Sequence, residues 1–334
     1  MRKRLFQLCV AVVACGALAA FVSGAGCSKK AAVNGALTLK AADDHPLDYP
    51  TTQGLLFMKK KIEAATGGRI QMKIYPAAVL GSKTQTIENT QMGTLDINRV
   101  SLAPLTAFSP KVGVFSMPYV FRDEAHFRKV LDGPIGDEVA KSLESKGIKL
   151  IAYYNSGARS FYNKTRPVNS PADLAGLKIR VQKSQIMTDL VNTLGASATP
   201  MSFEEVYTSI QTGAIDGAEN NAPSYVSTNH YDVAKFYSLT EHARVPDVVL
   251  ISMKSWNKMS PADQKIVMDA AKESEIEEAR LWDIREKADM EKLKKAGVKI
   301  NTPDVAPFRE KAKSMYDKYK GDYGDLIDRI QKVR

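Results

Sequence analysis

Short apolar segments alternate with amphipathic stretches along most of the chain. Hydrophobic and polar residues alternate with period two at 70–75, which predicts a β-strand with one buried face. Helices are predicted at 51–65, where Gly67 and Gly68 end the pattern, and at 83–92. Strands and helices in regular succession are typical of α/β proteins with largely parallel sheets. The pattern therefore predicts an α/β fold.

The same succession begins again after Asn155. Strands are predicted at 177–182 and 214–219, and helices at 185–194 and 203–212. Two α/β halves of similar size indicate two lobes, although no internal sequence repeat relates them.

The last third of the chain has a different character. Ser260, Pro261 and Asp263 have the features of a helix N-terminus, with an N-cap serine, a proline in the first turn and an acid three residues after the cap. No further glycine or proline occurs before Gly297. One helix of about 35 residues, about 50 Å long, is therefore predicted. Two shorter helices with a frayed join are the alternative.

The N-terminus has the features of an export signal. Basic residues at 2–4 precede an apolar, almost uncharged segment at 5–22 and four small residues at 23–26. This order predicts a signal peptide at 1–26. Cys27 stands where a bacterial lipoprotein carries its acylated cysteine, so a lipid anchor is predicted, and cleavage after Ala25 is the alternative.

Charge and composition narrow the class of ligand. The formal net charge is +10, and removing the three basic signal residues lowers it to +7, which favours anionic ligands. Lys and Arg are spread along the chain without a basic block, so no nucleic-acid partner is expected. The four histidines lack metal-ligand spacing, and neither a nucleophile elbow nor a phosphate loop occurs. We expect no cofactor, no metal and no enzymatic activity, although scattered carboxylates leave a glycosidase formally open.

Three positions are candidates for anion binding. In the strand at 177–182, the alternation places Arg180 on one face with Lys178 and Gln182. A cationic stripe in a helix-covered sheet lies at an edge or faces a cavity. Arg159 is predicted in a loop after a strand, and Asn220 ends another strand, where open α/β sheets bind ligands. A solvated edge strand and ordinary surface positions are the alternatives.

The chain resembles the periplasmic binding proteins of tripartite ATP-independent periplasmic (TRAP) transporters, of the dicarboxylate-binding type. The matching motifs run in family order and are Gly67-Gly-Arg-Ile, Tyr75-Pro, Leu80-Gly81, Gly93-Thr-Leu-Asp96, Met117-Pro-Tyr, Ala172-Asp-Leu-Ala-Gly-Leu-Lys-Ile-Arg180-Val and the long run from Met201 to Asn220.

The resemblance implies a two-lobed clamshell with crossing hinge strands and a long helix that spans both lobes. Lobe I would comprise 35–157 with 247–285, and lobe II 158–246 with 286–334. By the match of motifs, Arg180 clamps the carboxylate of the ligand, Arg159 and Asn220 assist, and Phe203 packs against the ligand. The implied protein is a periplasmic monomer that serves a TRAP permease and contacts the membrane only through a possible lipid anchor.

Other segments, such as Asp96-Ile-Asn-Arg99-Val, resemble the branch that binds hexuronates such as glucuronate and galacturonate. A sugar acid needs hydroxyl partners besides its carboxylate clamp. The candidates are His45, Asn98, Arg99, Ser101, Asn220 and Tyr225. Ala222 stands where this branch has Trp, so a stacking wall is expected to be missing. A C4-dicarboxylate-binding protein and a periplasmic ligand-sensing subunit are the alternatives.

Overall fold

The computed structural model describes residues 37–334. The predicted signal peptide at 1–26 and the predicted acylation site Cys27 lie outside the described residues. Both stay predictions.

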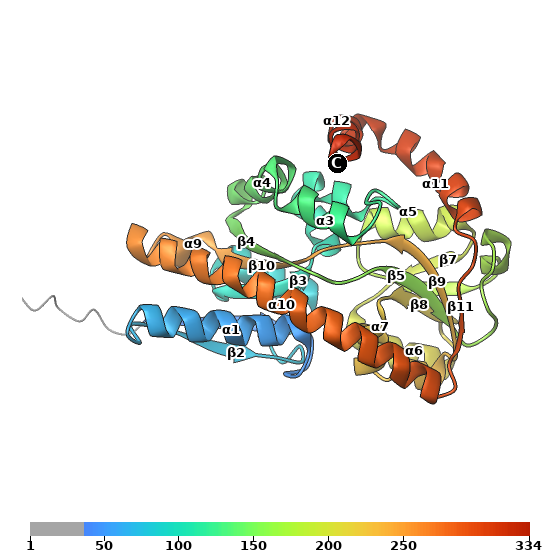
Figure 1. The fold of residues 1–334 in the computed structure, drawn as a ribbon, viewed down its shortest axis with the longest axis horizontal. Coiled ribbons are helices and arrows are strands. Elements are labelled where there is room, and N and C mark those ends of the chain that lie inside the picture. Colours follow the sequence, from blue (N-terminus) through green and yellow to red (C-terminus); the bar gives the residue numbers. More distant parts are fainter. Residues whose placement is uncertain (1–36) are drawn as a thin grey trace, which may run out of the picture. The chain divides into compact units, whose positions relative to one another are not determined.

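The described residues form two mixed sheets with flanking helices (Figure 1). The first sheet has the order β2-β1-β3-β10-β4. Its strands β1, β2 and β3 run parallel, whereas β10 is antiparallel to both of its neighbours. The bounds are β1 (Leu37–Asp43), β2 (Ile70–Tyr75), β3 (Ile97–Ser101), β4 (Ile148–Tyr154) and β10 (Asp247–Ser252).

The second sheet has the order β11-β9-β5-β8-β6-β7. Here β5 is antiparallel to β8 and β9, and the remaining pairs are parallel. The bounds are β5 (Arg159–Asn163), β6 (Lys178–Val181), β7 (Ser197–Pro200), β8 (Gly217–Asn220), β9 (Phe236–Ala243) and β11 (Lys299–Asn301). Parallel pairing therefore prevails away from β10 and β5.

The chain crosses between the two sheets immediately before β5 and immediately before β10. Residues 155–158 join β4 of the first sheet to β5 of the second, and residues 244–246 join β9 to β10. Short connections of this kind are the element-terminal segments at which hinges absorb a change of backbone angles. They match the expected crossing hinge strands.

The predicted long helix is a single element, α10 (Pro261–Lys295). The Ser260 side chain accepts a hydrogen bond from the Asp263 backbone N–H, as the N-terminal signal predicts. The helix packs on α1 (Pro50–Ala65), β4 and α7 (Ala222–Ser227), so it contacts elements associated with both sheets (Figure 1). The alternative of two shorter helices is wrong.

The remaining helices cover the sheets and link their edges. They are α2 (Lys83–Met92), α3 (Glu124–Leu131), α4 (Pro134–Lys141), α5 (Gln185–Leu194), α6 (Val206–Thr212), α8 (His230–Val233), α9 (Met253–Trp256), α11 (Ala306–Lys318) and α12 (Lys320–Lys332). The predicted helix at 203–212 begins with a 3₁₀ turn, η5 (Phe203–Glu205), before α6. Among residues 37–334, no helix combines the length and apolar character needed to cross a membrane.

The hydrophobic core has three parts. One lies under α1 and α10 against the first sheet, and another lies beneath the second sheet. The third joins residues of both sheets to α11 and α12, with Val248, Ile179 and Phe308 all fully buried. The boundaries proposed for the two lobes stay a prediction.

Candidate functional site

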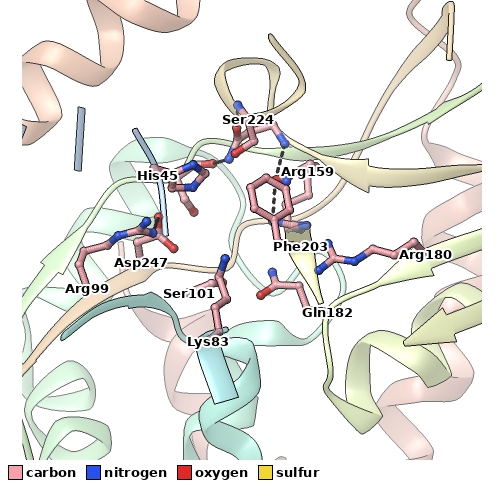
Figure 2. Close-up of a pocket in the computed structure, with 13 residues that line it drawn as sticks. His45, Lys83, Arg99, Ser101, Arg159, Arg180, Gln182, Phe203, Ser224 and Asp247 are labelled. Atoms are coloured by element: carbon pink, nitrogen blue, oxygen red, sulfur yellow. Dashed lines mark hydrogen bonds and ion pairs between the residues drawn. The ribbon is translucent and has the colours of Figure 1, made fainter. Parts of the chain in front are cut away.

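Side chains from both sheets surround one cavity (Figure 2). The first sheet contributes Arg99 and Ser101 from β3 and Asp247 from β10. The second sheet contributes residues from β5, β6 and β8. The full lining is His45, Lys83, Arg99, Ser101, Ser156, Arg159, Arg180, Gln182, Phe203, Asn220, Asn221, Ser224 and Asp247. Almost every member is polar, so the cavity suits a hydrophilic ligand.

Among the described residues, Arg180 is the cation of this cavity that has no carboxylate partner. The alternation of β6 buries Ile179 and Val181 in the core and turns Arg180 to the other face, where 3% of it is exposed. Its Nε and Nη2 both donate to the Met201 carbonyl, at 3.0 and 2.9 Å. Within residues 37–334 it makes no ion pair, and burial lowers its pKa. A buried guanidinium in this situation is a strong site for an anion.

Arg159, in contrast, already has a carboxylate partner. It opens β5 and donates to both carboxylate oxygens of Glu219, from Nε at 2.5 Å and from Nη2 at 2.8 Å. Burial opposes ionisation of Glu219, but the Arg159 guanidinium, together with the His242 ring 3.5 Å away, outweighs this and lowers the Glu219 pKa to about 2. The same ion pair raises the Arg159 pKa against the effect of its burial. The charge of Arg159 is therefore neutralised within the protein.

The Arg159 ion pair orients the amide of Asn220. Arg159 Nη1 donates to Asn220 Oδ1 at 2.9 Å, and the Asn221 backbone N–H donates to the same oxygen at 2.9 Å. The side-chain oxygen of Asn220 therefore accepts both of its hydrogen bonds from the protein. Asn220 Nδ2 donates no hydrogen bond to the described residues, so it is the group that a ligand oxygen can meet.

Phe203 provides an aromatic wall. Its ring lies 5.6 Å from the Arg180 guanidinium carbon and 4.7 Å from Lys83 Nζ. The His45 ring meets it edge-on, with 5.4 Å between centroids. Because His45 precedes α1 and Phe203 opens η5, this aromatic contact joins segments from the two halves of the cavity.

Several buried polar atoms of the lining have no hydrogen-bond partner within the described protein. They are His45 Nδ1, Ser101 Oγ, Gln182 Oε1 and Arg99 Nε. Buried polar groups are nearly always hydrogen-bonded, and an unpaired one costs about 1–3 kcal/mol. Their convergence on one cavity indicates a ligand that carries several hydroxyl groups.

A cluster of charges surrounds Arg99 on the first sheet. Arg99 Nη1 donates to Asp247 Oδ2 at 2.9 Å, and Nη2 donates to Asp44 Oδ1 at 2.7 Å and to Asp43. The Lys83 ammonium also pairs with Asp44. Three carboxylates therefore share two cations, and burial raises the Asp247 pKa to about 6 despite Arg99.

These carboxylates are not arranged as metal ligands. Among residues 37–334, no group of three or more His, Cys, Asp and Glu side chains is placed to hold a metal ion.

Most residues predicted from the sequence meet at the cavity. Those in the lining are Arg180, Arg159, Asn220, Phe203, Arg99, Ser101 and His45. Tyr225 and Asn98 are not: the Tyr225 hydroxyl donates to the Ala234 carbonyl, and Asn98 is buried within β3. Whether each lining residue contacts the ligand stays a prediction.

The structure corrects the backbone assignment of Arg159. The sequence predicts it in a loop, whereas it begins β5, whose five residues are all buried. A strand buried on both faces has no alternation of polar and apolar residues to mark it.

Sequence reasoning did not select six members of the lining: Lys83, Ser156, Gln182, Asn221, Ser224 and Asp247. Gln182 could have been found, because it shares a strand face with Arg180. Asp247 could not, because its role depends on Arg99, which lies 148 positions away in the sequence.

Ala222 lies outside this lining. It faces a second cavity together with Tyr237, Leu239 and Met290. The residue that distinguishes the chain from the hexuronate-binding branch is therefore not a wall of the cavity that holds Arg180.

A sequence profile covers most of the chain. The profile of bacterial extracellular solute-binding protein, family 7, matches residues 41–322. A solute-binding protein of Chromohalobacter salexigens is 37% identical over 323 residues, which cover 93% of this chain and 96% of that protein.

Two solved structures are similar in both sequence and fold. A TRAP periplasmic solute-binding protein from Pseudomonas putida F1, with bound D-glucuronate, gives a TM-score of 0.87 at 41% identity and covers 89% of this chain and 98% of its own. A second, from Bradyrhizobium sp. BTAi1 in complex with α/β-D-galacturonate, gives 0.86 at 45% identity and covers 88% and 99%. These similarities confirm the predicted two-lobed α/β fold.

Proposed function

This chain belongs to bacterial extracellular solute-binding protein family 7 and is a TRAP solute-binding protein, and we propose that its solute is a hexuronate such as glucuronate or galacturonate. The solutes bound in the two solved relatives support this choice. Family membership also supports a periplasmic location and delivery of the solute to a TRAP membrane permease, without any chemical change to it. Monomeric state and a lipid anchor at Cys27 complete the proposal.

Buried, unpaired Arg180 is the observation that carries the proposal. Its planar guanidinium can meet both oxygens of one carboxylate, which a lysine cannot do. Around it, the unpaired atoms of His45, Ser101 and Gln182 and the amide of Asn220 offer partners for ring hydroxyls. A single carboxylate on a hydroxyl-rich ring matches this distribution of one free charge and many polar atoms.

Closure follows from the division of the site between the two sheets. A ligand held first by Arg180 on β6 gains contacts to His45, Ser101 and Asp247 only when the other half of the cavity approaches. Because a ligand shifts an equilibrium only by its differential affinity for the two states, these added contacts favour the closed form. The crossings at 155–158 and 244–246 are the segments proposed to bend.

Isothermal titration calorimetry of the purified chain tests the function. We expect saturable binding of D-glucuronate or D-galacturonate and much weaker binding of succinate and malate. Arg180→Ala should cost about 2 to 5 kcal/mol of binding free energy. Arg180→Lys should also weaken binding, because the lysine ammonium lacks the planar set of N–H donors with which a guanidinium meets both carboxylate oxygens.

Lys178→Ala is the matched control, because Lys178 is an exposed cation on the same strand. Proton NMR of the ligand after release should give the spectrum of the unchanged sugar acid. Absence of binding to both uronates, or full affinity in Arg180→Ala, would reject the proposal.

A further inference from the structure

The two ends of the cavity differ in whether their cations are paired with carboxylates of the protein. Arg180 lies at one end with only a carbonyl partner, and Arg99 with Asp247 lies at the opposite end (Figure 2). At that opposite end, both terminal nitrogens of Arg99 already donate to carboxylates, and Lys83 pairs with Asp44. A second carboxylate on a ligand would find only Arg99 Nε as an unpaired cationic donor there, beside three carboxylates that already share Arg99 and Lys83.

Asp247 is the carboxylate of this cluster that reaches the cavity lining. Its Oδ2 accepts from Arg99, while its Oδ1 accepts no hydrogen bond from the described residues. An ionised carboxylate can only accept hydrogen bonds. The group of a ligand that meets Asp247 must therefore donate one, as a hydroxyl does and a carboxylate does not.

Two neighbouring side chains independently indicate a ligand group at this end. Ser101 and His45 line the same cavity and are buried, each only 5% exposed. Even so, Ser101 Oγ and His45 Nδ1 have no hydrogen-bond partner within the described protein. Ser101 and Asp247 are directly paired across β3 and β10, which fixes their spacing. A hydroxyl can donate to Asp247 and accept from Ser101.

We propose that Asp247, positioned by Arg99, determines specificity by requiring a hydroxyl at the end of the ligand remote from Arg180 and by rejecting ligands with a second carboxylate there. This inference rests on the proposed function and refines its substrate class. The class is polyhydroxy monocarboxylates, namely uronic and aldonic acids. Aldaric acids, which carry a carboxylate at both ends, are excluded.

Galactonate and galactarate form a matched pair of probes. Both are open-chain six-carbon acids with the same hydroxyl configuration, and they differ only in a terminal CH₂OH or carboxylate. Galactarate is a meso compound whose two ends are enantiotopic, so only the direction that places its C1 carboxylate at Arg180 reproduces the hydroxyl configuration of D-galactonate. Calorimetry with each acid, by competition against D-galacturonate where binding is weak, gives the ratio of their dissociation constants.

Wild-type protein should bind galactonate at least tenfold more tightly than galactarate. Asp247→Asn keeps an oxygen for Arg99, removes the negative charge and adds an N–H donor, so the ratio should fall at least tenfold. Asp269→Asn is the control, because it makes the same chemical change at an exposed position of α10. Its ratio should equal that of the wild type.

Asp44→Asn provides a second variant if Asp247→Asn fails to fold. It frees the Lys83 ammonium from its carboxylate, so it should also lower the ratio. Equal binding of galactarate and galactonate by the wild type, or an unchanged ratio in a folded Asp247→Asn or Asp44→Asn protein that still binds galacturonate, would overturn the inference. Failure of the wild type to bind galacturonate or glucuronate would instead overturn the proposed function.

Discussion

Arg180 and Arg159, two of the three buried arginines that line the cavity, should respond differently to the same substitution. Arg180→Met removes a cation with no ion pair and two hydrogen bonds to one carbonyl. The lost hydrogen bonds to a charged group are worth about 1.5–3 kcal/mol each at most, and they share a single acceptor. Removing the desolvation cost of the charge returns several kcal/mol. The free energy of unfolding should therefore stay within about 1 kcal/mol of wild type.

Arg159→Met removes the main charge partner of Glu219. Glu219 is fully buried, Arg159 provides its two shortest ion-pair contacts, and the contact that remains, from His242 Nε2, is 3.5 Å long. Removing one member of such a pair costs about 3–5 kcal/mol. The free energy of unfolding should fall by that amount, and the released Asn220 amide should weaken ligand binding as a second effect.

Urea denaturation of both variants, with and without D-galacturonate, measures the contrast. At a hundred times the dissociation constant, ligand should add about 2.7 kcal/mol to the wild type. At the same ligand concentration it should add less than about 1 kcal/mol to Arg180→Met. Equal destabilisation by the two substitutions, or a full ligand effect in Arg180→Met, would refute these roles. In them, Arg180 binds the ligand carboxylate, and the charge of Arg159 is neutralised by Glu219.

Further predictions concern the hinge and the response to pH. Gly157→Ala should destabilise the protein and shift the open–closed equilibrium, because φ is +58° there and an added Cβ would lie 2.8 Å from Glu286 Oε1 and 3.1 Å from the Trp282 ring. Urea denaturation measures the loss of stability, and small-angle scattering measures the shift. Wild-type stability and scattering would contradict this prediction. The Asp247 pKa of about 6 lies above its ordinary value of 3.8, so this group costs stability above pH 6, and the cost is relieved as pH falls from about 6 towards 3.8. Urea midpoints should show that gain in the wild type and less of it in Asp247→Asn, and equal pH profiles would contradict the assignment. The Glu219 pKa of about 2 lies below its ordinary value, so its contribution is present above pH 4.5 and is lost as pH falls from 4.5 towards 2; a flat stability profile across that range would contradict it.

Local patterns predicted the elements that carry a visible period or cap. The two-residue alternation at 177–182 predicted β6 and placed Arg180 and Gln182 on one face of it, leaving open whether that face lies at an edge or meets a cavity, and Ser260 with Pro261 predicted the start of α10. These predictions succeeded because each signal lies within a few residues of the feature it reports.

Features that depend on distant partners left no such signal. Arg159 and Glu219 are 60 positions apart, and nothing local indicates that Arg159 is neutralised while Arg180 has no carboxylate partner among the described residues. The same holds for the cluster around Arg99, because two of its carboxylates, Asp43 and Asp247, lie far apart in the sequence. Uniform burial hid β5 as well, because a strand covered on both faces shows no alternation.

A crystal structure of the chain with bound D-galacturonate tests the central claim most directly. We expect both oxygens of the sugar carboxylate within about 2.7–2.9 Å of the Arg180 guanidinium nitrogens, with a ring hydroxyl directed at Asp247. A sugar carboxylate that instead contacts Arg99 or Lys83, leaving Arg180 bound only to the Met201 carbonyl, would contradict the account.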